Sequence, residues 1–350
     1  MQTDNFNIKK VFSIHLNSNK PKNFNKFVNA FFKKISNINL LEIIVHIDNK
    51  DDAMKNEIIE LNRKYNNSIM YIETDLIKNF NDAWKPINLL LEKTSKSVLY
   101  VAVLSDDIVI ETDNWDLVLL NHFKHELFND KIFRVRCSQY KNHVYKDLWE
   151  CGYKPDFSFY TKKWLDIVGY WNPCIGPDTF QETVSYYLNQ YGKNYKRSII
   201  DGSLVFNGEE TLTNLNIKQR IIRAKLGYKS FSELISYKIQ KKSFEAAYSL
   251  AKEISEDKKT NIEIIKVNYI SHTFKNFIKK FKYFHYRGRK SWLTSSILFN
   301  IMFRLWCKID LFDEYLIFII LYLEKKDILK RIISNKEQYN KLKEAIKNNE

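Results

Sequence analysis

Val98–Asp107 reads VLYVAVLSDD, an apolar run that ends in two neighbouring carboxylates. An uninterrupted apolar run bounded by polar residues is typical of a strand that is buried on both faces of a sheet. At the mouth of such a strand Asp106 and Asp107 would repel each other and lose solvation, and a divalent cation is the natural compensator. Oxygen ligands suit Mn²⁺ or Mg²⁺, which we expect as the cofactor. The alternative is a solvated turn in which an aspartate caps the next helix.

Upstream of this run, short apolar segments rich in β-forming residues alternate with segments of helical periodicity. The expected strands are Val11–Leu16, Leu41–Ile47 and Ser68–Glu73, and the expected helices are Phe24–Ile35, Met54–Tyr65 and Asn81–Thr94. Strands and helices that alternate through short connections form an open, mostly parallel sheet with helices on both faces. The predicted fold class of this part of the chain is therefore α/β and Rossmann-like.

Polar residues follow each expected strand, at the edge where open α/β sheets bind their ligands. They are His15, Asn17, Asp48, Asp51, Asp75, Ser105, Asp106 and Asp107. A carboxylate at Asp48 could accept a hydrogen bond from a base or a ribose, and the alternative is a loop residue or a helix cap. The pattern predicts a nucleotide-binding site at this edge of the sheet.

The composition changes after about residue 210. From Glu210 to Glu350 the chain is nearly free of glycine and proline, and its apolar residues keep helical spacing, as in Ser243–Asp257. This favours a second, all-helical domain or a set of stacked helical pairs. We therefore expect two domains, residues 1–210 and residues 211–350, the second able to bind a membrane surface or a partner.

The chain carries a formal net charge of +15, which favours polyanionic partners. In Ser271–Trp292 basic residues alternate with aromatic residues, and acidic residues are missing. Such a stretch can lie on an anionic membrane surface or bind nucleic-acid phosphates. The alternative is a helix whose aromatic face packs within the C-terminal domain while its lysines are solvated.

The sequence shows no signal for export or for insertion into a membrane. The N-terminus MQTDNFNIKK lacks an apolar core, and the run Tyr315–Leu323 is far shorter than the roughly 20 residues that span a bilayer. The four cysteines have no zinc-ligand spacing, which fits a reducing compartment. We expect a cytoplasmic protein, held peripherally at the inner face of the membrane if residues 271–292 bind there.

The order of these segments resembles the donor half of family 2 glycosyltransferases with the GT-A fold. VFSIHLNSN, LEIIVHIDNKDD and SVLYVAVLSDDIVIETDNWD are similar to the strands after which that family binds its nucleotide and carries its DXD-type metal motif. The block Gly152–Gly192 is similar to the acceptor half, with an aromatic helix, a loop and an acidic residue that opens a helix. The resemblance covers about Val11–Asn207.

The resemblance implies transfer of a sugar from a nucleoside-diphosphate sugar, with UDP as the favoured nucleotide, to a glycan or lipid-linked acceptor in cell-surface polysaccharide biosynthesis. In an inverting displacement, Asp178 would act as general base, with Glu182 as its substitute one helical turn away. The metal at Asp106 and Asp107 would stabilise the departing diphosphate. The expected nucleotide contacts are His15, Asn17, Asp48, Asn88 and Asp106, and the expected acceptor contacts are Trp164 and Trp171. The alternatives are helix capping for Asp178 and core or rim packing for the tryptophans.

Three departures from the family pattern bear on these roles. Ser105 stands at the first position of the DXD-type motif, so metal binding would fall chiefly on Asp107 with help from Asp106. The acidic doublet near the acceptor is reduced to Asp178, and Asn207 stands where relatives often show a histidine. Two other functions therefore stay open. One is a nucleic-acid-binding α/β protein, which the carboxylates at the strand end disfavour, and the other is a catalytically inactive transferase fold that serves as a scaffold.

Overall fold

The structure is a computed structural model of the chain. It describes residues 9–77, 82, 84–124, 128–139, 157–174, 177–208, 233 and 237–258. The basic aromatic stretch 271–292 and most of the expected helical domain lie outside the described residues.

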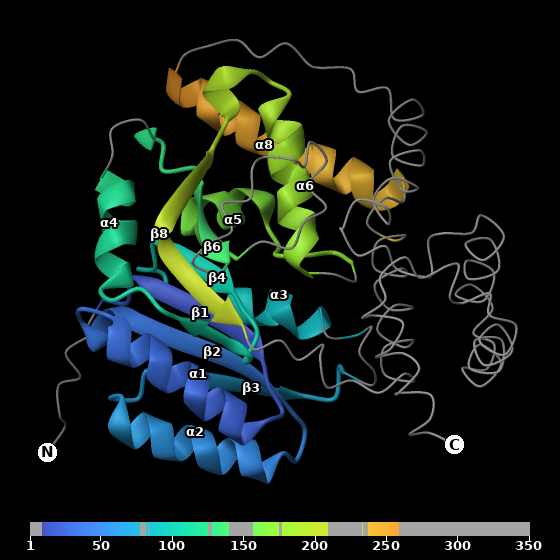
Figure 1. Cartoon of the computed structure of the whole chain (residues 1–350). Coiled ribbons are helices and arrows are strands. Elements are labelled where there is room, and N and C mark those ends of the chain that lie inside the picture. Colours follow the sequence, from blue (N-terminus) through green and yellow to red (C-terminus); the bar gives the residue numbers. More distant parts are fainter. Residues whose placement is uncertain are drawn as a thin grey trace, which may run out of the picture. The chain divides into compact units, whose positions relative to one another are not determined.

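An eight-stranded sheet of order β3-β2-β1-β4-β7-β6-β8-β5 forms the centre of the described part (Figure 1). The strands are β1 (Phe12–Asn17), β2 (Leu41–Asp48), β3 (Ile69–Thr74), β4 (Tyr100–Val103), β5 (Ile108–Ile110), β6 (Arg134–Gln139), β7 (Ser158–Thr161) and β8 (Ser198–Gly208). Neighbours in β3-β2-β1-β4 are parallel, as predicted. In the second half β6 and β8 are parallel, whereas β7 runs antiparallel to β4 and β6, and β5 runs antiparallel to β8.

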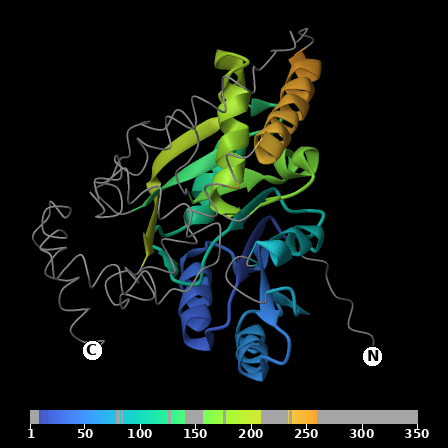
Figure 2. The same ribbon diagram turned by 90° about the vertical axis from the view of Figure 1, so that its right-hand side faces the viewer.

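Helices cover both faces of the parallel strands, which confirms the predicted arrangement. Helices α1 (Pro21–Lys34) and α2 (Asp52–Lys64) lie on one face, and α3 (Lys85–Glu92) lies on the other (Figures 1 and 2). Successive side chains of a strand point to opposite faces. Alternate residues of β1, the first of them Phe12, are therefore buried in the core that α1 completes, whereas His15 points to the α3 side.

An aromatic cluster joins the two halves of the sheet. The residues that α1 buries are Phe24, Phe27, Val28, Phe31 and Phe32. Phe31 meets the edge of Trp115, the first residue of α4 (Trp115–Lys124), with ring centroids 5.8 Å apart. Trp115 in turn stacks on Phe159 of β7 at 5.5 Å. Large aromatic rings in such geometry contribute both buried area and specific ring contacts to stability.

Three helices pack beside the mixed half of the sheet: α5 (Lys162–Val168), α6 (Pro177–Asn189) and α8 (Tyr237–Lys258). Two short 3₁₀ helices, η1 (Ile38–Leu40) and η4 (Lys193–Tyr195), precede β2 and β8. None of the helices within the described ranges is both long enough and apolar enough to cross a bilayer.

Helix α8 belongs with the sheet rather than with a separate helical domain. Residue contacts group Met1–Glu209 with Lys238–Ile265, and group Glu210–Tyr237 with Lys266–Glu350. This differs from the expected boundary, which put every residue after 210 in the second domain. The reason is that α8 buries an apolar stripe, Ala247, Leu250, Ala251 and Ile254. On α6, Tyr187 donates a hydrogen bond to Gln240 Oε1 at 2.5 Å and meets the ring of Phe244 edge-on.

Candidate functional site

The carboxyl ends of β1, β2 and β4 meet at one polar rim. Strand β1 ends at the half-buried Asn17 and β2 ends at Asp48, while β4 runs into residues 104–107, which alone separate it from β5. The backbone amide of Ser18 donates to the carbonyl of His46 at 3.1 Å. This hydrogen bond holds the chain that leaves β1 beside the end of β2.

The acidic pair of the LSDD segment lies at this rim, half-buried. Ser18 Oγ donates to Asp106 Oδ2 at 2.6 Å, and the Ser105 hydroxyl donates to Asp107 Oδ1. Burial raises the pKa of Asp106, the charge of Asp107 raises it further, and the hydrogen bond from Ser18 together with the charge of Lys20 opposes the rise. The arrangement therefore contains negative charge that the surrounding groups compensate only in part.

The donor set fits a hard divalent cation that takes further ligands from elsewhere. Neither Asp106 nor Asp107 forms a salt bridge with a described residue. Across the parts of the chain that the structure describes, no three His, Cys, Asp or Glu side chains converge to hold a metal by themselves. Mg²⁺ and similar ions are commonly held by one or two carboxylates together with substrate phosphates and water. The pair matches that pattern.

Asp48 is available for a ligand, and Asp51 is a helix cap. The Asp51 carboxylate accepts from the amide of Met54 at 3.0 Å and so caps the N-terminus of α2. The side chain of Asp48, partly exposed at the end of β2, has no hydrogen-bond or ion-pair partner among the described residues. Asp51, and not Asp48, therefore caps the helix.

His15 is not at the rim, so the expectation that it contacts the nucleotide is corrected. Its side chain is fully buried, with Nε2 3.0 Å from Ser13 Oγ and 3.1 Å from Thr94 Oγ1. Burial, with a smaller contribution from the charge of Lys162, lowers the pKa of His15 to about 3. The imidazole is therefore neutral and joins β1 to the end of α3. The alternation of side chains along β1 is the physical reason.

Asn88 on α3 is a clamp on the loop that precedes α6. Its Nδ2 donates to the carbonyl of Asn172 at 2.8 Å, and its Oδ1 accepts from the amides of Trp171 at 2.9 Å and of Asn172 at 3.1 Å. These contacts occupy both ends of the side-chain amide. The structure thus gives Asn88 a role in holding the loop in place of the expected nucleotide contact.

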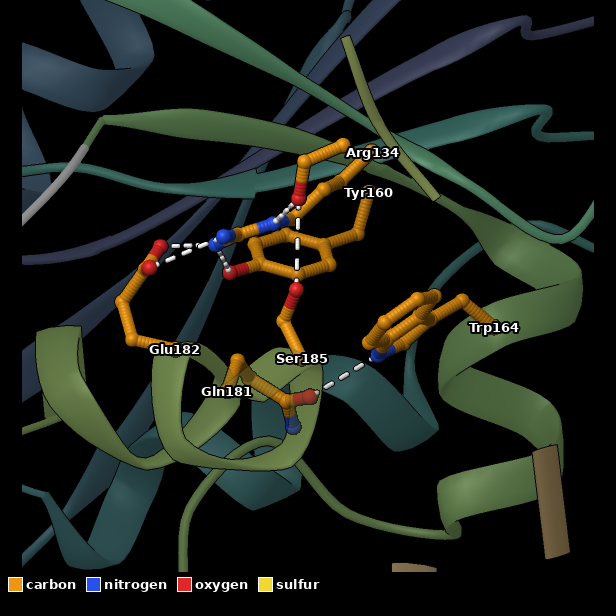
Figure 3. A network of polar contacts seen from close by, with 7 residues as sticks. Arg134, Tyr160, Trp164, Gln181, Glu182 and Ser185 are labelled. Carbon is orange, nitrogen blue, oxygen red and sulfur yellow. Dashed lines mark hydrogen bonds and ion pairs between the residues drawn. The ribbon is translucent and has the colours of Figure 1, made fainter. Parts of the chain in front are cut away.

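Glu182, the expected substitute base, forms a buried ion pair with Arg134 (Figure 3). Arg134 Nη2 donates to Glu182 Oε2 at 2.8 Å, and Nη1 donates to Oε1. Glu182 is 6% exposed and Arg134 is 3% exposed. A carboxylate whose two oxygens are held by a guanidinium inside the protein is poorly placed to accept a proton from an acceptor.

Of the other residues expected on the acceptor side, Asp178 lies at the start of a helix, and Trp164 and Trp171 lie in the core. Asp178 lies in the first turn of α6, and its side chain is outside what the structure describes. Trp164 is fully buried, with Nε1 donating to Gln181 Oε1 at 2.9 Å, and Trp171 is 4% exposed. Burial leaves no ring face of Trp164 for a sugar to stack on, so the structure supports the packing alternative for both tryptophans.

Comparison of the whole chain with known proteins identifies its fold. No known family profile matches the chain, and no curated protein matches its sequence significantly. A solved mannosyltransferase, PcManGT from Pyrobaculum calidifontis in complex with GDP-Man and Mn²⁺, superimposes with a TM-score of 0.52 at 11% identity, over 86% of this chain and 88% of that one. The chain has a GT-A-type fold.

Two other solved structures of this type are more distant. Staphylococcus aureus TarS has a TM-score of 0.41 at 13% identity, over 65% of this chain and 40% of that one. Glucosyl-3-phosphoglycerate synthase from Mycobacterium tuberculosis, in complex with Mn²⁺, UDP and glucosyl-3-phosphoglycerate, has a TM-score of 0.42 at 11% identity, over 65% and 79% of the two chains.

Within this GT-A-type fold, three residues matter that the sequence reasoning did not single out for their roles. Ser18 orients Asp106, Gln181 holds Trp164 and the loop before α6, and Arg134 pairs with Glu182. Ser18 could have been found, because it follows directly on the end of the first strand. No local signal marks Arg134, because its partner lies 48 residues away in the sequence.

Proposed function

We propose that this protein is a metal-assisted glycosyltransferase that takes its sugar from a nucleoside-diphosphate sugar. The observation that carries the proposal is the half-buried Asp106–Asp107 pair at the strand ends of a GT-A-type sheet. Ser18 orients Asp106, and neither carboxylate forms a salt bridge with a described residue. A second acid, Asp48, ends β2, which β1 separates from β4, and its side chain has no hydrogen-bond or ion-pair partner among the described residues. PcManGT, which shares the fold, was solved with GDP-Man and Mn²⁺.

Each residue of the rim has a distinct part in this proposal. Asp106 and Asp107 would hold Mn²⁺ or Mg²⁺, which when bound neutralises charge on the leaving diphosphate. Ser18 keeps Asp106 aimed at that position, and Asp48 accepts hydrogen bonds from the ribose or base. Asp178 takes the proton from the acceptor hydroxyl, because Glu182 is already committed to Arg134. The acceptor oxygen then bonds to the anomeric carbon as the nucleoside diphosphate departs from the opposite face, which inverts the configuration.

The acceptor in this proposal is a glycan or a lipid-linked sugar of cell-surface polysaccharide biosynthesis. The support for it is the net charge of +15 and the basic aromatic stretch Ser271–Trp292, which together favour an anionic membrane surface. The protein would then work from the cytoplasm, attached peripherally to the membrane. Nucleic acid is the less favoured partner, because the carboxylates at the rim would repel phosphates where no metal intervenes.

The test is a thermal-shift panel with UDP, GDP, CDP and dTDP, each with and without Mn²⁺. A ligand that binds only the native state raises the melting temperature. We expect one nucleotide to raise it strongly with Mn²⁺ and weakly in EDTA, with UDP as the first candidate. If none of the four nucleotides shifts the melting temperature in either condition, the proposal is overturned.

A further inference from the structure

A buried network of polar side chains joins α6 to the sheet, and ordinary core packing does not require it (Figure 3). A buried ion pair costs desolvation and is often no more stabilising than a packed apolar pair. Arg134 and Glu182 are nevertheless almost completely buried. An expensive, directional interaction at the start of a helix calls for a role beyond stability.

Three strands fix the guanidinium of Arg134. Arg134 is the first residue of β6, its Nη1 donates to Tyr160 Oη of β7 at 3.0 Å, and its Nε donates to Ser198 Oγ of β8 at 2.6 Å. The donors that remain face α6, where they bind both oxygens of Glu182. Because the guanidinium is planar and rigid, its orientation sets the position of the carboxylate it binds.

Two more side-chain contacts hold the same part of α6. Ser185 Oγ lies 3.2 Å from Ser198 Oγ, one turn beyond Glu182. Gln181 accepts from Trp164 Nε1 at 2.9 Å and donates to the carbonyl of Trp171 at 2.7 Å. Side chains of α6 therefore bind the sheet through Glu182 and Ser185, and bind α5 and the preceding loop through Gln181.

This anchored turn follows Asp178 directly. Glu182 is four residues after Asp178, so the two residues share one face of the helix. Strand β8 ends where it pairs with the start of β5, Gly208 opposite Ile108, and β5 begins immediately after Asp107. In Figure 1 the end at which α6 begins is the one that lies toward the arrowhead of β8, so the first turn of the helix is on the same side as the polar rim.

We propose that Arg134 and Glu182 are positioning residues that fix the first turn of α6 and so hold Asp178 at the acceptor side of the site. The inference rests on the proposed function, in which Asp178 is the general base. Proximity and orientation of a catalytic group contribute strongly to rate, and small misplacements are costly. Loss of the pair should therefore reduce turnover and leave donor binding unchanged.

The decisive variant replaces the ion pair by apolar residues of similar size, Arg134→Met with Glu182→Leu. Such replacements are often neutral or stabilising, so a folded protein without the directional contact is expected. We expect kcat to fall about tenfold with an unchanged KM for the donor, which is the effect of a misplaced catalytic group. A second variant, Arg134→Lys, keeps the positive charge but loses the planar guanidinium that binds both carboxylate oxygens. It should lower kcat in the same way.

The matched control is the other buried guanidinium–carboxylate pair, Arg197 with Asp130. Arg197 Nη1 donates to Asp130 Oδ1 at 2.9 Å, and both side chains are 1% exposed. This pair has the same chemistry and comparable burial, but it joins the start of β8 to the segment before β6 rather than to α6. The corresponding Arg197→Met with Asp130→Leu variant should keep kcat and KM at the wild-type values.

Amide hydrogen exchange separates this inference from the proposed function. The amides of residues 181–184 donate to carbonyls of the first turn of α6, so their protection reports whether that turn is formed. Protection of these amides should fall about tenfold in the double variant and stay unchanged in the control. Unchanged protection and unchanged kcat would overturn the positioning role. If the wild type transfers no sugar from any of the four nucleotide donors, the proposed function fails, and the exchange result alone decides whether the pair fixes the turn.

Discussion

At the scale of single residues, the protonation of the carboxylates at the polar rim depends on how far the surrounding groups compensate their negative charge. Burial and the neighbouring charge of Asp107 raise the pKa of Asp106, while the hydrogen bond from Ser18 lowers it. A bound cation would reverse this balance, because it favours the charged form of both carboxylates. Asp106 and Asp107 would therefore lower the stability of the metal-free protein and, for the same electrostatic reason, bind the metal and the diphosphate.

Asp107→Ala should remove metal-dependent nucleotide binding and leave the fold intact, because the lost carboxylate is a liability to the metal-free protein. At a nucleotide concentration of about 100 times Kd, the wild type should gain about 5–10 °C in melting temperature with Mn²⁺, and the variant should gain none of it. Asp113→Ala is the control, since that carboxylate is exposed and pairs with Lys34. An Asp107→Ala protein with a full Mn²⁺-dependent shift would refute the metal assignment.

Asp106→Asn should change how stability depends on pH. The folded protein has the higher pKa for Asp106, so its contribution to stability is fully present below the unfolded value near 3.8 and is lost as the pH rises through the folded value. The asparagine variant has no such proton. In EDTA its melting temperature should therefore rise relative to the wild type as the pH increases above about 4. Melting curves that run parallel over this range would show that the Asp106 carboxylate carries no such penalty.

At the scale of elements, the loop between α5 and α6 is held by side-chain amides from two helices. Asn88 of α3 binds the backbone of Trp171 and Asn172, and Gln181 of α6 binds the carbonyls of Tyr170 and Trp171. Loop backbone polar groups in the interior need such partners. The loop therefore enters α6 along a path that α3 helps to define.

Asn88→Ala tests whether this residue serves the loop or the nucleotide. Removal of the side-chain amide leaves three backbone groups near Asn172 without a partner, which should cost about 1–3 kcal/mol of unfolding free energy. Chemical denaturation measures that loss, and titration with the best nucleotide and Mn²⁺ measures affinity, which should not change. If the variant keeps the wild-type stability and binds the nucleotide more weakly, Asn88 contacts the nucleotide and the loop-holding role is wrong.

The parallel half of the sheet could be predicted because its evidence is local. A short stretch of sequence is enough to predict each apolar strand, such as Leu41–Asp48, and each amphipathic helix, such as α1. The location of the rim follows from topology alone. Side-chain direction did not follow, because the sequence does not say which face of β1 lies under α3, and this misplaced His15. Long-range pairs such as Arg134 with Glu182 leave no local signal at all.

At the scale of the whole chain, α8 completes the sheet domain although it follows the change in composition near residue 210. Helical periodicity showed that residues 243–257 form a helix, but it could not show which core the apolar stripe enters. The structure answers this through the contacts of Tyr187 with Gln240 and Phe244, and through the ion pair of Lys163 with Glu253 at 3.1 Å. The first unit therefore needs a segment from beyond the expected boundary.

A fragment of residues 1–265 should accordingly fold cooperatively, whereas a fragment of residues 1–209 should not. Without α8 the shorter fragment exposes Tyr187 and loses the burial of Ile239, Leu250 and Ile254, which is worth on the order of 5 kcal/mol. That is a large share of the stability of an ordinary domain. In the full chain, Leu250→Ala should cost about 2–5 kcal/mol and Ser249→Ala, at an exposed position of the same helix, close to nothing. Denaturant melts decide the matter, and a shorter fragment as stable as the longer one would place α8 outside the sheet domain.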